Sequence, residues 1–103
     1  MTSEKVLNIV LDEINFKFDI SNMHGVNLRQ ALITRVLQEY KSAMDRSKSF
    51  NLWTVLEENG DGSGYKIFYD EEENSFGLGV KSEKEELLCL GIYGTFLETL
   101  ESM

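Results

Sequence analysis

Residues 52–70 read LWTVLEENGDGSGYKIFYD, and this stretch decides the expected fold class. Residues 52–56 are rich in strand-forming side chains, and residues 65–70 follow a period of two that suits a second strand. Between them, residues 59–64 carry three glycines, which adopt tight-turn conformations at no steric cost. The stretch therefore predicts a β-hairpin.

Two further strands and a helix are expected after this hairpin. In residues 76–81 apolar side chains alternate with Gly77, Gly79 and Lys81, whereas residues 87–93 are almost all apolar, as in a central or doubly buried strand. Thr95 and Glu98 have the spacing of a capping box, which predicts a short helix that closes the chain at residue 103.

The first half of the chain predicts two helices. Apolar residues recur at helical spacing after Ser3, a candidate cap, and indicate a helix over residues 3–15. Residues 16–20 alternate as a short strand would, but we expect a loop there. Asn27 with Gln30 resembles a capping box and predicts a second helix that reaches residue 46. Its core-facing stripe consists of Leu28, Leu32, Val36, Tyr40 and Ala43.

These elements define the expected architecture. The order is α-α-β-β-β-β-α, within one domain that spans residues 1–103. Short connections imply a four-stranded antiparallel meander, and the separate helices must cover one of its faces. We therefore expect an α+β domain of two layers.

Negative charge is concentrated in the second half of the chain. The net charge is -8. Residues 1–50 hold seven basic and six acidic residues, whereas residues 51–103 hold three basic and twelve acidic residues. Such a field repels phosphate groups, so we expect no binding to nucleic acid or to an anionic membrane. A basic protein partner would be attracted.

The sequence also bears on location. No run approaches the roughly 18 apolar residues of a membrane span, and the amino end lacks the pattern of a secretory signal. The chain has one cysteine, Cys89, which allows no internal disulfide. We therefore expect a cytoplasmic protein.

Two acidic clusters are the candidate binding site. They fall in the turns before and after the strand over residues 76–81, so we expect two negative rims at opposite edges of the sheet. Either run could equally be a solvated turn with no further role. The predicted partner-binding residues are Asp61, Tyr69, Asp70, Glu71, Glu72, Glu73, Glu83, Glu85 and Glu86.

Catalytic and metal sites are not expected. Counted from Asn59, the turn matches part of an EF-hand calcium loop, but its flanks are strand-like and a hairpin turn explains every residue. A general acid and a general base need two carboxylates whose environments push their pKa values apart, whereas carboxylates in exposed turns share one solvent environment. Cys89 lies in an apolar run, and His24 has no second histidine or cysteine beside it. We therefore predict no catalytic residue, metal or cofactor.

Gly77 and Gly79 fall on one face of a predicted strand. Glycine weakens a strand, so two on one face indicate close approach by another backbone or by a large side chain such as Trp53 or Tyr69. A tightly packed helix above this face is one explanation, and a groove for a ligand or partner is the other.

The protein is similar in type to the small acidic immunity proteins and inhibitors with which bacteria neutralise basic toxin domains, often nucleases. The resemblance is one of size, charge and fold class over the whole chain, and it involves no specific motif. It implies a non-enzymatic protein that occludes a basic surface, with carboxylates such as Asp70, Glu71 and Glu72 paired with lysines and arginines of the partner.

Two other functions fit the same sequence. Secretion chaperones also tend to be small, acidic, α+β and dimeric, although their helices usually interrupt the strands. A small enzyme or metabolite-binding domain would place its cleft above Gly77 and Gly79. The sequence leaves the oligomeric state open.

Overall fold

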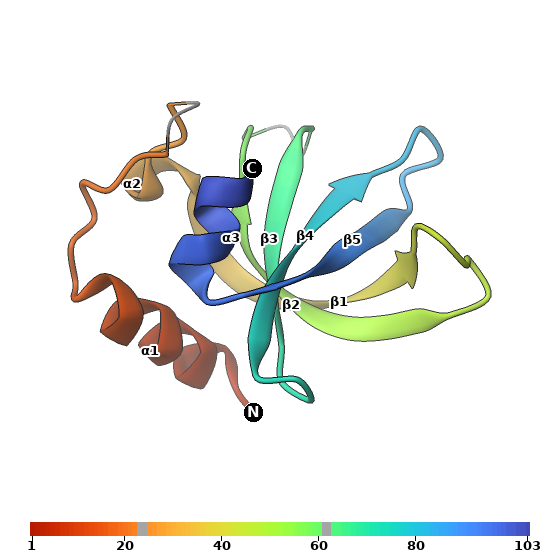
Figure 1. Ribbon diagram of the computed structural model, residues 1–103, viewed down its shortest axis with the longest axis horizontal. Helices are drawn as coiled ribbons and strands as arrows, with labels where there is room; N and C mark the ends of the chain where they lie inside the picture. Colours follow the sequence, from red (N-terminus) through yellow and green to blue (C-terminus); the bar gives the residue numbers. More distant parts are fainter. Residues whose placement is uncertain (23–24, 61–62) are drawn as a thin grey trace.

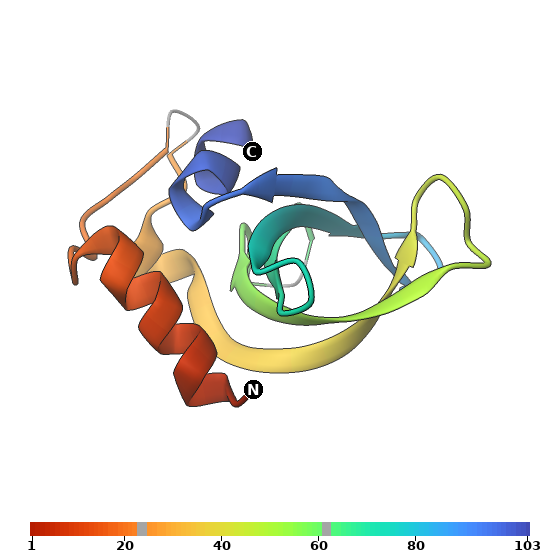
Figure 2. The ribbon, with the colours of Figure 1, turned by 60° about the horizontal axis from the view of Figure 1, so that its bottom comes forward.

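Five strands roll into a closed barrel, and the helices lie together on one side of it (Figures 1 and 2). The computed structural model describes residues 1–22, 25–60 and 63–103. Its elements are α1 (Ser3–Ile14), α2 (Leu28–Ala31), β1 (Leu32–Ser42), β2 (Ser49–Glu57), β3 (Tyr65–Asp70), β4 (Ser75–Lys81), β5 (Leu87–Gly94) and α3 (Phe96–Ser102).

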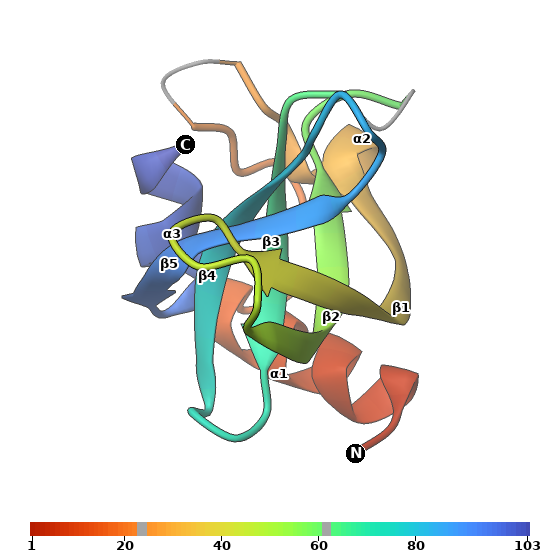
Figure 3. The ribbon, with the colours of Figure 1, turned by 90° about the vertical axis from the view of Figure 1, so that its right-hand side faces the viewer.

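The barrel is a meander that closes on itself. Each strand pairs antiparallel with the next, from β1 to β5. The closing contact is a parallel one, in which Lys41 and Ser42 of β1 lie opposite Leu88 and Cys89 of β5. Figure 3 shows the end of β1 beside the start of β5. The predicted α+β class and the antiparallel order of the last four strands are confirmed, but the sheet has five strands and is not open.

The predicted second helix is wrong. Asn27 caps it as expected, with its side chain accepting a hydrogen bond from the Arg29 amide, but the helix ends after one turn at Ala31. Residues 32–42 form β1 instead. The β-branched residues Ile33, Thr34 and Val36 lose side-chain freedom in a helix and suit a strand. The apolar spacing of residues 32–42 suits a helix as well as a strand, so pairing with β2 decides the conformation.

The other predicted helices are confirmed, with small changes at their ends. Thr2, rather than Ser3, caps α1, since its hydroxyl accepts a hydrogen bond from the Lys5 amide. Both hydrogen bonds of the expected capping box between Thr95 and Glu98 are present at α3. Residues 16–20 form no strand, as expected. No helix among the described residues is long and apolar enough to span a membrane.

Side chains pack on both faces of the barrel wall. The larger core lies between the helices and the outer face of β2, β3 and β4. It consists of Val6, Val10, Ile14, Val26, Leu28, Ala31, Val55, Leu56, Ile67, Tyr69, Phe76, Leu78, Phe96, Leu100 and Met103. The smaller core fills the barrel and consists of Tyr40, Leu52 and Phe68, with Leu87 and Cys89 against it.

The close approach expected at Gly77 and Gly79 is present, but inside the barrel. A Cβ atom added to Gly77 would lie 2.5 Å from Cζ of Phe68, and one added to Gly79 would lie 2.7 Å from Cε2 of Tyr40. The side chains that make these contacts are Phe68 and Tyr40, not Trp53 or Tyr69. The expected approach of another backbone is also present, since the carbonyl oxygens of Gly91 and Leu88 lie as close. These two aromatic rings occupy the space directly above the glycines.

A short chain of hydrogen bonds satisfies the polar groups inside the barrel. Thr54 donates to Oε1 of Gln38 at 2.6 Å, and the Tyr40 hydroxyl lies 2.5 Å from Oγ1 of Thr54. Because the single Thr54 proton is used for Gln38, Tyr40 is the donor to Thr54. Burial raises the pKa of the Tyr40 phenol to about 12.

We predict that Gly77→Ala destabilises the protein by about 2 kcal/mol or more, because the barrel interior has no room for another methyl group. The added Cβ would also lie 2.2 Å from the carbonyl oxygen of Gly91, and a backbone atom cannot swing aside. Urea unfolding measures the change. Gly60→Ala is the matched control, since a Cβ there meets nothing within 4 Å. Equal stability of the two variants would contradict the packing described.

We predict that the free energy of unfolding falls between pH 10 and pH 12, by roughly 2 to 3 kcal/mol in total, because Tyr40 ionises near pH 10 when unfolded. The folded phenol keeps its proton to about pH 12, so alkali favours the unfolded state over this interval. Urea titrations across this range measure the decline. Tyr40→Phe should reduce its slope, whereas Tyr93→Phe, at an exposed phenol, should retain it.

Candidate functional site

The first acidic cluster lies in the turn between β3 and β4, where local hydrogen bonds hold the backbone. The Asp70 carboxylate accepts a hydrogen bond from the Glu72 amide at 3.0 Å. Asn74 adopts a left-handed conformation with φ of 49°, and its side-chain oxygen accepts a hydrogen bond from the Tyr69 hydroxyl at 2.6 Å. Glu71, Glu72 and Glu73 are all exposed to solvent in this turn.

A groove runs beside this turn. It has a volume of about 560 Å³ and is lined by Leu37, Ser49, Phe50, Asn51, Leu52, Asp70, Glu71 and Glu72. We call it the acidic groove. Leu37 is 48% exposed and Phe50 is 40% exposed, although both are large apolar side chains. The groove thus combines carboxylates with accessible apolar surface.

Few positive charges oppose the carboxylates of the acidic groove. Among the described residues, the ion pair formed by this turn is between Glu71 and the amino group of Met1, at 3.9 Å. The pKa of Tyr69 is raised, first by burial and then by the neighbouring carboxylates of Glu71 and Asp70. Burial is the larger of these causes, and the two carboxylates act in the same direction.

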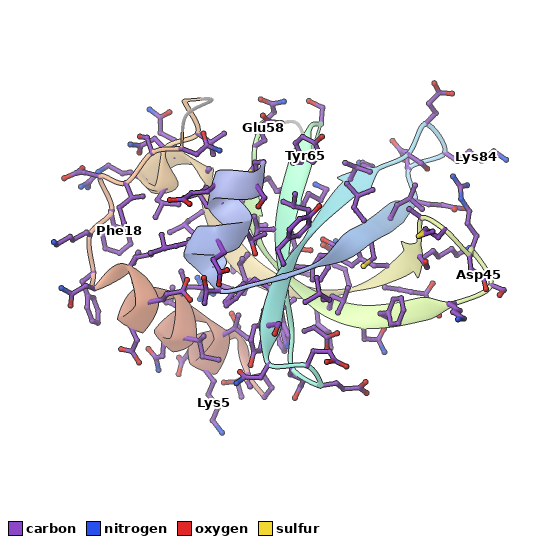
Figure 4. All side chains as sticks on the ribbon, in the orientation of Figure 1. Lys5, Phe18, Asp45, Glu58, Tyr65 and Lys84 are labelled. Carbon is purple, nitrogen blue, oxygen red and sulfur yellow. The ribbon has the colours of Figure 1, made fainter. Side chains whose placement is uncertain are left out.

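The second acidic cluster lies at the opposite end of β4, in the turn that leads to β5. Glu83 and Glu85 are exposed. Glu86 forms two ion pairs, with Lys41 and with Arg46, each at 3.7 Å. Figure 4 shows Asp45 and Lys84 at this same end of the molecule, where charges of both signs are mixed. The two clusters are therefore separated as expected, but their electrostatic environments differ.

Glu85 has an unusual backbone conformation. Its φ is 63°, in the left-handed region that normally favours glycine or asparagine. Its amide donates to the carbonyl of Ser82, and the Glu86 amide donates to the Ser82 hydroxyl, so the turn itself holds this conformation. The Glu85 side chain lines a separate groove with Gln38, Glu39, Lys41, Glu86 and Leu87.

The predicted site residue Asp61 lies outside the described residues, as does His24. The flanks of the glycine-rich turn form the expected hairpin, in which Glu58 accepts a hydrogen bond from the Tyr65 amide and Asn59 donates to Ser63.

In the part of the chain that the structure describes, no three histidine, cysteine or acidic side chains are placed to hold a metal ion. Burial raises the pKa of the Cys89 thiol, which packs against the inner core.

The sequence-based prediction missed five residues that line the acidic groove: Leu37, Ser49, Phe50, Asn51 and Leu52. Leu37 and Phe50 are the exposed large apolar side chains among them. The predicted second helix contains Leu37, and Phe50 lies between that helix and the first predicted strand. Residues 42–49 read SAMDRSKS, a run of turn-forming residues between two apolar segments. This signal indicates a hairpin, and it would have placed both residues on strands beside the acidic turn.

Comparison of the chain with protein-family models, with curated proteins and with solved structures found no match.

Proposed function

We propose that this protein binds a basic protein surface through the acidic groove and blocks it, in the manner of the small acidic immunity proteins and inhibitors. It acts by occupying the partner's functional surface and performs no chemistry of its own. A toxin or nuclease domain is the class of partner that suits this mechanism, because such domains use lysine and arginine to hold phosphate.

The observation that carries the proposal is the arrangement of charge along the acidic groove. Asp70, Glu71 and Glu72 line it, and among the described residues the ion pair formed by these carboxylates joins Glu71 to the Met1 amino group. A partner's lysine or arginine brought to 4 Å from one carboxylate gains about 1 kcal/mol in water and about 4 kcal/mol where the interface excludes much of the solvent. Such pairs also steer the encounter and accelerate association.

The apolar residues of the groove supply a second contribution. Leu37 and Phe50 each leave about half of their surface accessible in the free protein. Covering apolar surface gains roughly 25 cal/mol per Å², and affinity in interfaces is concentrated on such central apolar anchors. The carboxylates at the rim then select a basic partner, and Leu37 and Phe50 slow its release.

The second cluster has a smaller part in this proposal. The Glu86 carboxylate is shared between Lys41 and Arg46, which offsets its charge before any partner arrives. Glu83 and Glu85 add to the negative field at long range, and salt screens this effect beyond about 8 Å.

We predict that the double variant Glu72→Lys, Glu73→Lys loses capture of the partner from the native cells. It should also lose the ability to inhibit the captured partner. The association rate of the purified pair should fall about tenfold or more at low salt, because the change turns attraction into repulsion. Surface plasmon resonance at several salt concentrations measures the rate.

The matched control is Asp12→Lys, Glu101→Lys, which changes the net charge equally at exposed positions on α1 and α3. Its association rate should stay within about threefold of wild type. Equal losses in both variants would mean that net charge alone attracts the partner. A partner without a basic binding surface would overturn the proposal.

A further inference from the structure

The first part of β2 has a free edge beside the acidic groove. On one side, Phe50 and Leu52 are registered with Tyr40 and Gln38 of β1. On the other side, the pairing with β3 begins at Trp53, opposite Tyr69, and β3 ends one residue later at Asp70. Residues 49–51 therefore extend beyond the end of β3, as Figure 1 shows where β2 continues past it to the right.

The hydrogen-bond pattern tells which backbone groups face this edge. The Ser42 amide donates to the Lys48 carbonyl at 3.0 Å. In an antiparallel ladder such bonded pairs recur at every second residue. Phe50 and Leu52 therefore direct their N–H and C=O groups to β1, and Ser49 and Asn51 direct theirs to the free edge. Within the described chain no strand is registered opposite those two residues on that side.

This edge lacks the features with which proteins normally protect a free strand. Residues 49–56 read SFNLWTVL, with no charged residue and no proline. Edge strands are usually blocked by lysine, by proline or by a covering loop, because open N–H and C=O groups recruit another strand. The free edge also lines the acidic groove, through Ser49, Phe50 and Asn51.

We infer that the free edge of β2 binds an extended basic segment of the partner as an added strand. This inference rests on the proposed function and specifies its mode of recognition. The segment's backbone pairs with the N–H and C=O groups of Ser49 and Asn51, and alternate side chains fall on the two faces of the sheet. Its lysines or arginines reach Glu71 and Glu72 of the acidic turn, and its apolar side chains cover Phe50.

Charge selects this occupant over a second copy of the chain. Two copies joined through the same β2 edge would bring their acidic turns together, with Asp70, Glu71 and Glu72 of each facing those of the other. Like charges brought together in this way oppose association. The same carboxylates attract a basic segment.

Amide hydrogen exchange in the wild-type protein tests the inference. In the free protein, the Ser49 and Asn51 amides should exchange at least about tenfold faster than those of Phe50 and Leu52, because only the latter are bonded to β1. The probe is the synthetic peptide acetyl-Lys-Val-Lys-Val-Lys-Val-Lys-amide. At saturation it should slow exchange at Ser49 and Asn51, and the same peptide with glutamate in place of lysine should not.

A proline substitution at the free edge supplies the second test. Asn51→Pro removes the N–H that faces the edge and spares the bonds to β1, as edge strands tolerate. It should weaken peptide binding about tenfold, whereas Asn51→Ala, which keeps the N–H, should stay within about twofold. Hydrogen exchange of the wild-type protein decides the matter if the proline variant does not fold.

The outcomes separate this inference from the proposed function. If the folded proline and alanine variants bind the peptide equally while Glu72→Lys, Glu73→Lys does not, strand addition is wrong and binding to a basic partner stands. If the turn variant also binds normally, both fail. Protected Ser49 and Asn51 amides in the free protein, or dimers seen by sedimentation, overturn strand addition by showing that the edge is already occupied.

Discussion

The packing of two aromatic rings against two glycines is the contact on which the rest of the structure depends. Phe68 of β3 lies over Gly77, Tyr40 of β1 lies over Gly79, and the two rings are 5.2 Å apart and tilted by 53°. Because the glycines carry no side chain, β4 approaches both rings closely and the sheet curls around them. The barrel interior is thereby filled, and the outer face of the same strands remains available to the helices.

Barrel closure also determines how charge is distributed. It brings the end of β1 to the start of β5, where Lys41 and Arg46 reach Glu86. One end of the barrel therefore carries mixed charges. The other end, at the turn between β3 and β4, keeps its excess of carboxylates beside exposed apolar side chains. The four acidic residues of the turn at residues 70–73 thus stay together at one end of the barrel, whereas Glu83, Glu85 and Glu86 lie at the other end of β4.

The unequal lengths of β2 and β3 link this charge to recognition. Since β3 ends at Asp70 while β2 begins at Ser49, the same step in the sheet creates the groove, exposes the β2 edge and places the acidic turn beside it. In the proposed function, these features act together on one partner. Carboxylates attract it, the free edge orients it, and Leu37 and Phe50 hold it.

The sequence by itself determined the hairpins after residue 52, the first and last helices, and the acidic character of the turn at residues 70–73, because these follow from local periodicity and turn chemistry. The tertiary structure decided the conformation of residues 32–42, whose apolar spacing suits a helix and a strand equally until β2 pairs with them. The tertiary structure also decided which carboxylates form ion pairs with lysine or arginine. The partners of Glu86 come from a distant segment, and only closure of the barrel brings them within reach.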